Sequence, residues 1–362
     1  MNARKYLTVV LSAVMLVSAL GVALYAVPRT AAGGEGFKEA RKAQQLLVQR
    51  CQAGDRTMCE LLPAVDKAFD GDLEGSISMM ESFRQRDDFF RTRCHDASHV
   101  VGKLSYHEYG ILEAIANLPA GCMGGVYHGA LEEWGFFAEA DEMRQTAGQV
   151  CEPLRAVGSV GHEICIHGLG HALERNSRDW KVASEVCEDA LTGVDSTSCV
   201  YGAVASAIDD YMMRTGSVYS IEQIEELITE CSSLARAASV CVEVAVFKAL
   251  PGTNRARYEQ AHSLCARIEG FNEECSHGLG MVVAAYNMVN PKLSPTVCRR
   301  ASEDLYDACL GGASTWVAMN MDDAELAKSI CQTPGHVIGK RCRAILDDID
   351  RLIEGHRTLD KR

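Results

Sequence analysis

The sequence contains few prolines and aromatic residues, and it lacks the short cysteine motifs of metal and redox domains. Proline accounts for 8 of the 362 residues, and aromatic residues make up 6%. No two cysteines are separated by only two residues, which excludes zinc-ribbon, thioredoxin-type and c-type haem motifs. There is also no G-x-S-x-G, P-loop or dinucleotide-binding motif. Alternating β-branched residues are scarce, so the sequence favours an all-α fold.

Basic residues are also in the minority. There are 36 Lys and Arg residues against 49 Asp and Glu residues, which gives a formal net charge of −13. Three of the basic residues lie in the first 30 positions, so the remainder is more acidic still. A nucleic-acid partner would need a basic surface, and this composition argues against one.

The N-terminus contains the only long uncharged segment. Residues 7–27 are predominantly apolar, and a segment of about 20 such residues can span a bilayer. Because Arg4 and Lys5 precede it, we expect a transmembrane signal anchor with the rest of the chain on the extracytoplasmic side, as in the periplasm. A cleaved signal peptide and a buried core helix are the alternatives. The expected division is an anchor or signal peptide (1–30), a linker (31–36), a repeat domain (37–354) and a polar tail (355–362).

Sixteen cysteines follow this segment, and in an exported chain an even number predicts disulfide bonds. From Cys151 onward they alternate between two series with a period near 34 residues, which is typical of helix–turn–helix repeats. The first series is Cys151, Cys187, Cys231, Cys265, Cys298 and Cys331, and the second is Cys165, Cys199, Cys241, Cys275, Cys309 and Cys342.

Each repeat is expected to be an outer helix that ends near the first cysteine and an inner helix that starts at the second. The predicted fold is therefore an all-α solenoid of α/α hairpins, stapled by disulfides and either open or closed into a toroid. The expected pairs are Cys51–Cys59, Cys94–Cys122, Cys151–Cys165, Cys187–Cys199, Cys231–Cys241, Cys265–Cys275, Cys298–Cys309 and Cys331–Cys342. Pairing between adjacent units, and the other connectivities of the first four cysteines, remain open.

The cysteine spacing from Cys151 to Cys342 resembles the Sel1-like, TPR-related repeats of bacterial cysteine-rich secreted proteins. Those repeats usually place seven residues between paired cysteines, as at Cys51 and Cys59, whereas the later units here have nine to thirteen. The chain is also similar to α/α toroids of the lanthionine-cyclase type, whose inner helices open with motifs that contain Gly and His. Those enzymes are cytosolic and bind zinc through thiolates, so neither family implies a function for particular residues here.

Histidines recur at fixed positions after the inner cysteines. The motif "CIHGLGHAL" begins at Cys165, and a near copy, "CSHGLGMVV", begins at Cys275. Positions i and i+4 share a helix face, so the pairs His95/His99 and His167/His171 each present two imidazoles on one side. His128 occupies the same column of the repeat, and His277 stands alone in it.

Two imidazole pairs on helix faces are typical of a transition-metal site. We expect His95, His99, His128, His167 and His171 to bind Zn²⁺, Fe²⁺ or Cu²⁺, with His277 as a further candidate. The first turn of each inner helix should favour neutral imidazole, because its exposed N–H groups disfavour a positive charge. His262, His336 and His356 lie outside the column and are expected at the surface.

The sequence leaves two hypotheses for the function. The first is a metal site, used either for binding or for metal-assisted hydrolysis or oxidation, with Glu132 or Glu163 as the base. The segment "HEICIH" from His162 to His167 also resembles a zinc-peptidase motif with one residue too many. The second function is a scaffold whose concave face binds a protein or peptide, with structural histidines.

Overall fold

The structure is a computed structural model that describes the protein in the ranges 37–86, 88–122, 124–156, 159–250, 255–287, 290–321 and 323–359. Within these ranges the chain contains helices and no strand, so the predicted all-α class is confirmed. The segment 7–27, on which the anchor prediction depends, lies outside the described residues, as does the linker 31–36. None of the described helices is both long and apolar enough to cross a membrane.

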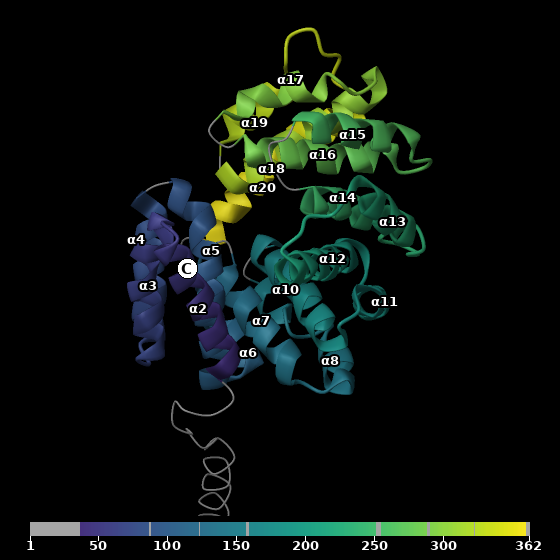
Figure 1. The fold of residues 1–362 in the computed structure, drawn as a ribbon. Coiled ribbons are helices and arrows are strands. Elements are labelled where there is room, and N and C mark those ends of the chain that lie inside the picture. Colours follow the sequence, from purple (N-terminus) through teal and green to yellow (C-terminus); the bar gives the residue numbers. More distant parts are fainter. Residues whose placement is uncertain are drawn as a thin grey trace, which may run out of the picture. The chain divides into compact units, whose positions relative to one another are not determined.

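A series of inner helices runs through the unit formed by residues 39–362, and each contacts the next in the series (Figure 1). Except for the last of them, these helices have no distinct apolar and polar faces, as expected for helices that are packed on several sides. The series is α5 (Asp88–Tyr109), α7 (Gly125–Phe137), α10 (Ser159–Ser177), α12 (Gly193–Thr215), α14 (Ala238–Ala249), α16 (Asn272–Tyr286), α18 (Glu303–Met321) and α20 (Lys340–Leu359).

Shorter outer helices each pack on the inner helix that follows them in sequence. Most begin with an N-capping side chain: Asp179 accepts from the Lys181 amide, Asp323 from the Leu326 amide, and Ser220 forms a capping box with Gln223. They are α11 (Trp180–Ala190), α13 (Ile221–Cys231), α15 (Arg255–Arg267), α17 (Ser294–Cys298) and α19 (Ala324–Cys331). The alternation of outer and inner helices agrees with the predicted helical repeat, while the solenoid or toroid form stays a prediction.

The helices before and between these hairpins complete the chain. α2 (Lys38–Gln52), α3 (Arg56–Phe69) and α4 (Leu73–Arg86) precede the inner series, α6 (Ile111–Asn117), α8 (Ala140–Thr146) and α9 (Glu152–Arg155) flank α7, and the 3-10 turn η2 (Pro291–Leu293) precedes α17. α20 continues to Leu359, so residues 355–359, expected in a polar tail, extend the last inner helix.

Eight disulfides join the hairpins, and all sixteen cysteines take part. Their pairs are the same as those expected from the spacing. In the chain-entropy view each bridge restricts the unfolded chain, and for the short loops closed here that is worth about 2–4 kcal/mol.

The inner helices begin earlier than the sequence pattern indicated. α10 starts at Ser159 and α12 at Gly193, in both cases well before the cysteine that was expected to open the helix. The inner helix was expected to start at Cys165, but Gly161 is already buried within α10. Tertiary packing here outweighs the low helix propensity of glycine, which costs about 1 kcal/mol relative to alanine.

Candidate metal centre

Five histidines from three consecutive inner helices converge on one site. α5 supplies His95 and His99, α7 supplies His128, and α10 supplies His167 and His171. The ring of His128 lies between the two pairs: its centroid is 5.1 Å from that of His95 and 5.1 Å from that of His167. Its distances to His99 and His171 are 5.6 and 5.5 Å. The structure thus brings together the five histidines predicted to bind metal.

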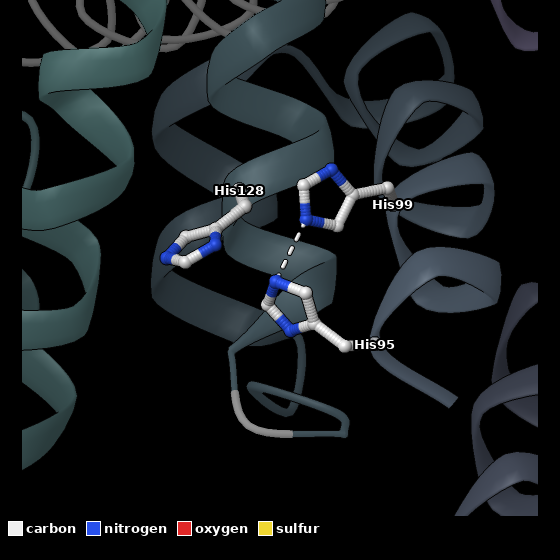
Figure 2. A group of neighbouring side chains, drawn as sticks. All are labelled: His95, His99 and His128. Carbon is white, nitrogen blue, oxygen red and sulfur yellow. Dashed lines mark hydrogen bonds between the residues drawn. The ribbon is translucent and has the colours of Figure 1, made fainter. Parts of the chain in front are cut away.

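The first pair has a defined hydrogen-bonding pattern. The Nε2 atoms of His95 and His99 are 3.0 Å apart (Figure 2). His95 Nδ1 lies 3.0 Å from the carbonyl oxygen of Cys122, and His99 Nδ1 lies 3.1 Å from Glu132 Oε1. A carbonyl or carboxylate oxygen can only accept, so both Nδ1 atoms are donors. In neutral rings both Nε2 atoms then carry lone pairs, and these face each other.

His128 adds a third nitrogen with a lone pair. Its Nε2 lies 3.1 Å from the carbonyl oxygen of Ile164 and therefore donates to it. Its Nδ1 is buried and has no hydrogen-bond partner. One ring nitrogen from each of His95, His99 and His128 lies within 4.8 Å of the others, as a shared ion would require, and Figure 2 shows the three rings gathered around one space.

The second pair repeats this arrangement on α10. The Nε2 atoms of His167 and His171 are also 3.0 Å apart. His167, His171 and His128 form a second grouping with one nitrogen each within 4.8 Å of the others. The second pair is held less firmly, because His171 Nδ1 lies 4.0 Å from Glu132 Oε1, beyond hydrogen-bonding distance.

Glu132 places a negative charge beside the histidines. It is 8% exposed and lies one turn after His128 on α7. Its Oε2 accepts from Lys103 Nζ at 2.7 Å, and Arg175 lies 3.9 Å away. Burial disfavours the carboxylate, but Lys103, His99 and Arg175 outweigh it and hold the pKa of Glu132 well below its usual range. An ionised carboxylate next to a ligand histidine orients the ring and makes it a stronger ligand.

Burial, rather than helix position, is the main cause that lowers the pKa of four of these histidines, His95, His128, His167 and His171. Burial, aided by the neighbouring His99, lowers the pKa of His95 to about 4. Burial likewise lowers the pKa of His171 to about 4, although Glu132 opposes it. The helix-terminus explanation expected from the sequence is wrong for the pairs, because they lie well inside α5 and α10. His128 does lie in the first turn of α7, and there burial and the neighbouring histidines lower its pKa.

The glycines of the repeated motif allow the inner helices to touch through their backbones. A Cβ added at Gly170 would overlap the carbonyl oxygen of Cys199, and one added at Gly202 would overlap that of His167. The same reciprocal contact joins Gly280 and Gly312 to the carbonyls of Cys309 and His277. Only glycine permits this approach, which explains why "HGLG" occurs twice in fixed register.

Other residues singled out in the sequence lie away from the site. His277 Nδ1 lies 2.9 Å from Glu243 Oε2, without the geometry of a hydrogen bond, and His277 belongs to no metal-binding grouping of the described residues. Glu163 is exposed and contacts Ser198 instead, so of the two base candidates only Glu132 adjoins the histidines. His162 faces Asp195 at 3.4 Å, and the peptidase-like motif therefore does not assemble.

The histidines expected at the surface are partly buried. His262 is only 6% exposed. His336 contacts Asp307 at 3.0 Å in a third grouping, Asp307, His336 and Cys342. Cys342 is bonded to Cys331 and has no thiolate to offer, and Asp307 also accepts from the amides of Gly339 and Arg341. This grouping is therefore a helix-capping network. His356 lies where side chains are not described.

The sequence analysis did not predict the buried polar residues that follow His99 along α5. Lys103 and His107 continue the i+4 column of His95 and His99 along α5. His107 Nε2 lies 2.7 Å from Glu133 Oε1, and Glu133 is fully buried. The i+4 spacing was a signal that could have identified them, since it already relates the two histidines.

Comparisons of this chain with protein-family models, curated proteins and solved structures found no match. The functional argument therefore depends on the site.

Proposed function

We propose that this protein binds a divalent transition metal through the histidines of α5, α7 and α10, within an exported, membrane-anchored helical-repeat chain. The observation that supports the metal is the 3.0 Å separation of the His95 and His99 Nε2 atoms while both Nδ1 atoms are committed to oxygen acceptors. Two lone pairs at this distance repel unless a cation lies beside them. Two nitrogen ligands of a tetrahedral ion with bonds of about 2.0–2.1 Å are roughly 3.3 Å apart.

Zn²⁺, Fe²⁺ and Cu²⁺ all accept imidazole ligands and are the candidates. Three histidines with a fourth position for water resemble the donor set of catalytic metal sites, in which the ion lowers the pKa of bound water. Because Glu132 is held by Lys103 and His99, it acts in this proposal as an orienting carboxylate for the ligands. The export of the chain is supported by the disulfides, which persist in oxidising compartments.

The test is elemental analysis of the full-length chain purified without a polyhistidine tag, followed by titration of the metal-stripped protein with Zn²⁺ and Cu²⁺. We expect one tightly bound equivalent. A variant with His95, His99, His167 and His171 all changed to Gln should lose it. His277→Ala, at the equivalent repeat position on α16, should keep it.

Circular dichroism and thermal denaturation establish that each variant is folded. If the wild-type chain contains no metal and takes up none, an imidazolium proton occupies the space between the rings. The alternative then stands: a scaffold that binds a protein or peptide on its concave face and uses its histidines structurally.

A further inference from the structure

Two chelating pairs share one histidine. His128 belongs to the grouping with His95 and His99 and to the grouping with His167 and His171. Its ring is almost equally distant from both pairs, 5.1 and 5.6 Å on one side and 5.1 and 5.5 Å on the other. The two pairs come from different helices, α5 and α10, which lie on either side of α7.

A neutral imidazole has one lone pair and one N–H group. When His128 Nε2 donates to the Ile164 carbonyl, as observed, only Nδ1 can bind a metal. In the other tautomer the lone pair is on Nε2, and the hydrogen bond to Ile164 is lost. His128 can therefore complete one three-histidine position at a time, unless it loses both protons.

The charges around the site also favour a single ion. Glu132 is the carboxylate that reaches both pairs, with Oε1 at 3.1 Å from His99 and 4.0 Å from His171. Its other oxygen is already engaged by Lys103 at 2.7 Å, with Arg175 at 3.9 Å. Two divalent ions would bring four positive charges next to one carboxylate and these two cations. Like charges a few ångströms apart in a buried site repel strongly, and the repulsion between two divalent ions is four times that between unit charges at the same distance.

We infer that the five histidines form two overlapping positions for one metal ion, and that the ion exchanges between them as His128 changes the nitrogen it offers. This inference rests on the proposed function. The position at His95 and His99 is the stronger, because both Nδ1 atoms there have acceptors that fix the tautomer. At the second position the corresponding distance from His171 to Glu132 is too long for a hydrogen bond.

The experiment is a titration of the metal-stripped full-length chain with Cu²⁺, with stoichiometry from native mass spectrometry and coordination from electron paramagnetic resonance. The wild type should bind one equivalent and give two superimposed spectra. The variants His95→Ala/His99→Ala and His167→Ala/His171→Ala should each still bind one equivalent and give a single spectrum, and the two spectra should differ. His128→Ala should weaken binding by at least about 100-fold, since it removes a ligand from both positions.

The affinity losses of the pair variants should be unequal. Losing the second pair should reduce affinity by less than about tenfold, and losing the first pair by more, in line with the second-shell contacts that orient the first pair. The variant His277→Ala serves as the matched control, and circular dichroism checks that each variant is folded.

Three outcomes contradict the inference in distinguishable ways. Two equivalents in the wild type would mean a dinuclear centre bridged by a doubly deprotonated His128. If one pair variant loses all binding while the other matches the wild type, the site is single and fixed. Both results leave the proposed metal function intact. An absence of binding in the wild type would overturn the proposed function itself.

Discussion

The two copies of the histidine–glycine motif, on α10 and α16, have the same packing but different polar surroundings. In both, the second glycine lies against a cysteine carbonyl of the next inner helix, and a glycine of that helix lies against the histidine carbonyl. On α10 the motif continues to His171, and His128 of α7 packs beside it. On α16 the equivalent residue is Met281, and His277 lies beside Glu243 instead. The glycines of the motif are thus architectural in both regions. Of the two copies, the one on α10 contributes histidines to a metal-binding grouping of the described residues, and the one on α16 does not.

The largest expected effect is a loss of stability when the glycine contacts shared by α10 and α16 are disturbed. Gly170→Ala and Gly280→Ala should each destabilise the protein by about 1–3 kcal/mol or more, because the added Cβ would overlap a backbone oxygen that cannot move without separating two helices. The measurement is the midpoint of urea unfolding.

Gly148→Ala is the matched control, because its Cβ would lie 3.4 Å from the nearest atom, the Ala190 oxygen. A large loss for Gly170→Ala with none for Gly280→Ala would show that the two copies do not share one packing role.

A smaller effect, on metal affinity, should distinguish the histidine site around α10 from the surroundings of His277 on α16. Glu132→Gln should weaken metal binding by about 10–100-fold, because it removes the charged partner of the His99 ring. Glu243→Gln, which makes the same change beside His277, should leave metal affinity unchanged. Isothermal titration with Zn²⁺ measures both. Equal losses in the two variants would mean that the acidic residues act through overall charge, and the assignment of Glu132 as an orienting group would be wrong.

The smallest expected effect is a gain of weak metal binding on α16. Met281→His places a second imidazole one turn after His277, and the new pair should bind an additional metal ion weakly, since His277 belongs to no metal-binding grouping of the described residues. The number of bound equivalents should rise by one at high metal concentration. Met281→Gln, which is polar but lacks the imidazole, should not change it. If Met281→His binds no extra ion, the spacing alone does not make a site in this fold.

Much of the fold could be predicted from local patterns. The cysteine period predicted the alternation of outer and inner helices, and the pairs expected within each unit are those in the structure. The starts of α10 and α12 could not be predicted from the cysteine pattern, because each helix begins six residues before its cysteine, in a segment that contains a glycine. The structural histidines were also missed: His262 and His336 are buried or bonded by residues distant in sequence, which no local spacing reports.

The two histidine pairs follow from local helix geometry. Residues four apart on a helix share a face, so HxxxH on α5 and on α10 places each pair of rings together regardless of the rest of the chain. The position of His128 between the pairs depends instead on how closely α7 packs against both neighbouring helices. The tertiary structure also decided which ring nitrogens carry lone pairs, since their partners at Cys122, Glu132 and Ile164 come from other segments of the chain. Helix geometry is local, whereas the choice of hydrogen-bond acceptor depends on contacts between helices.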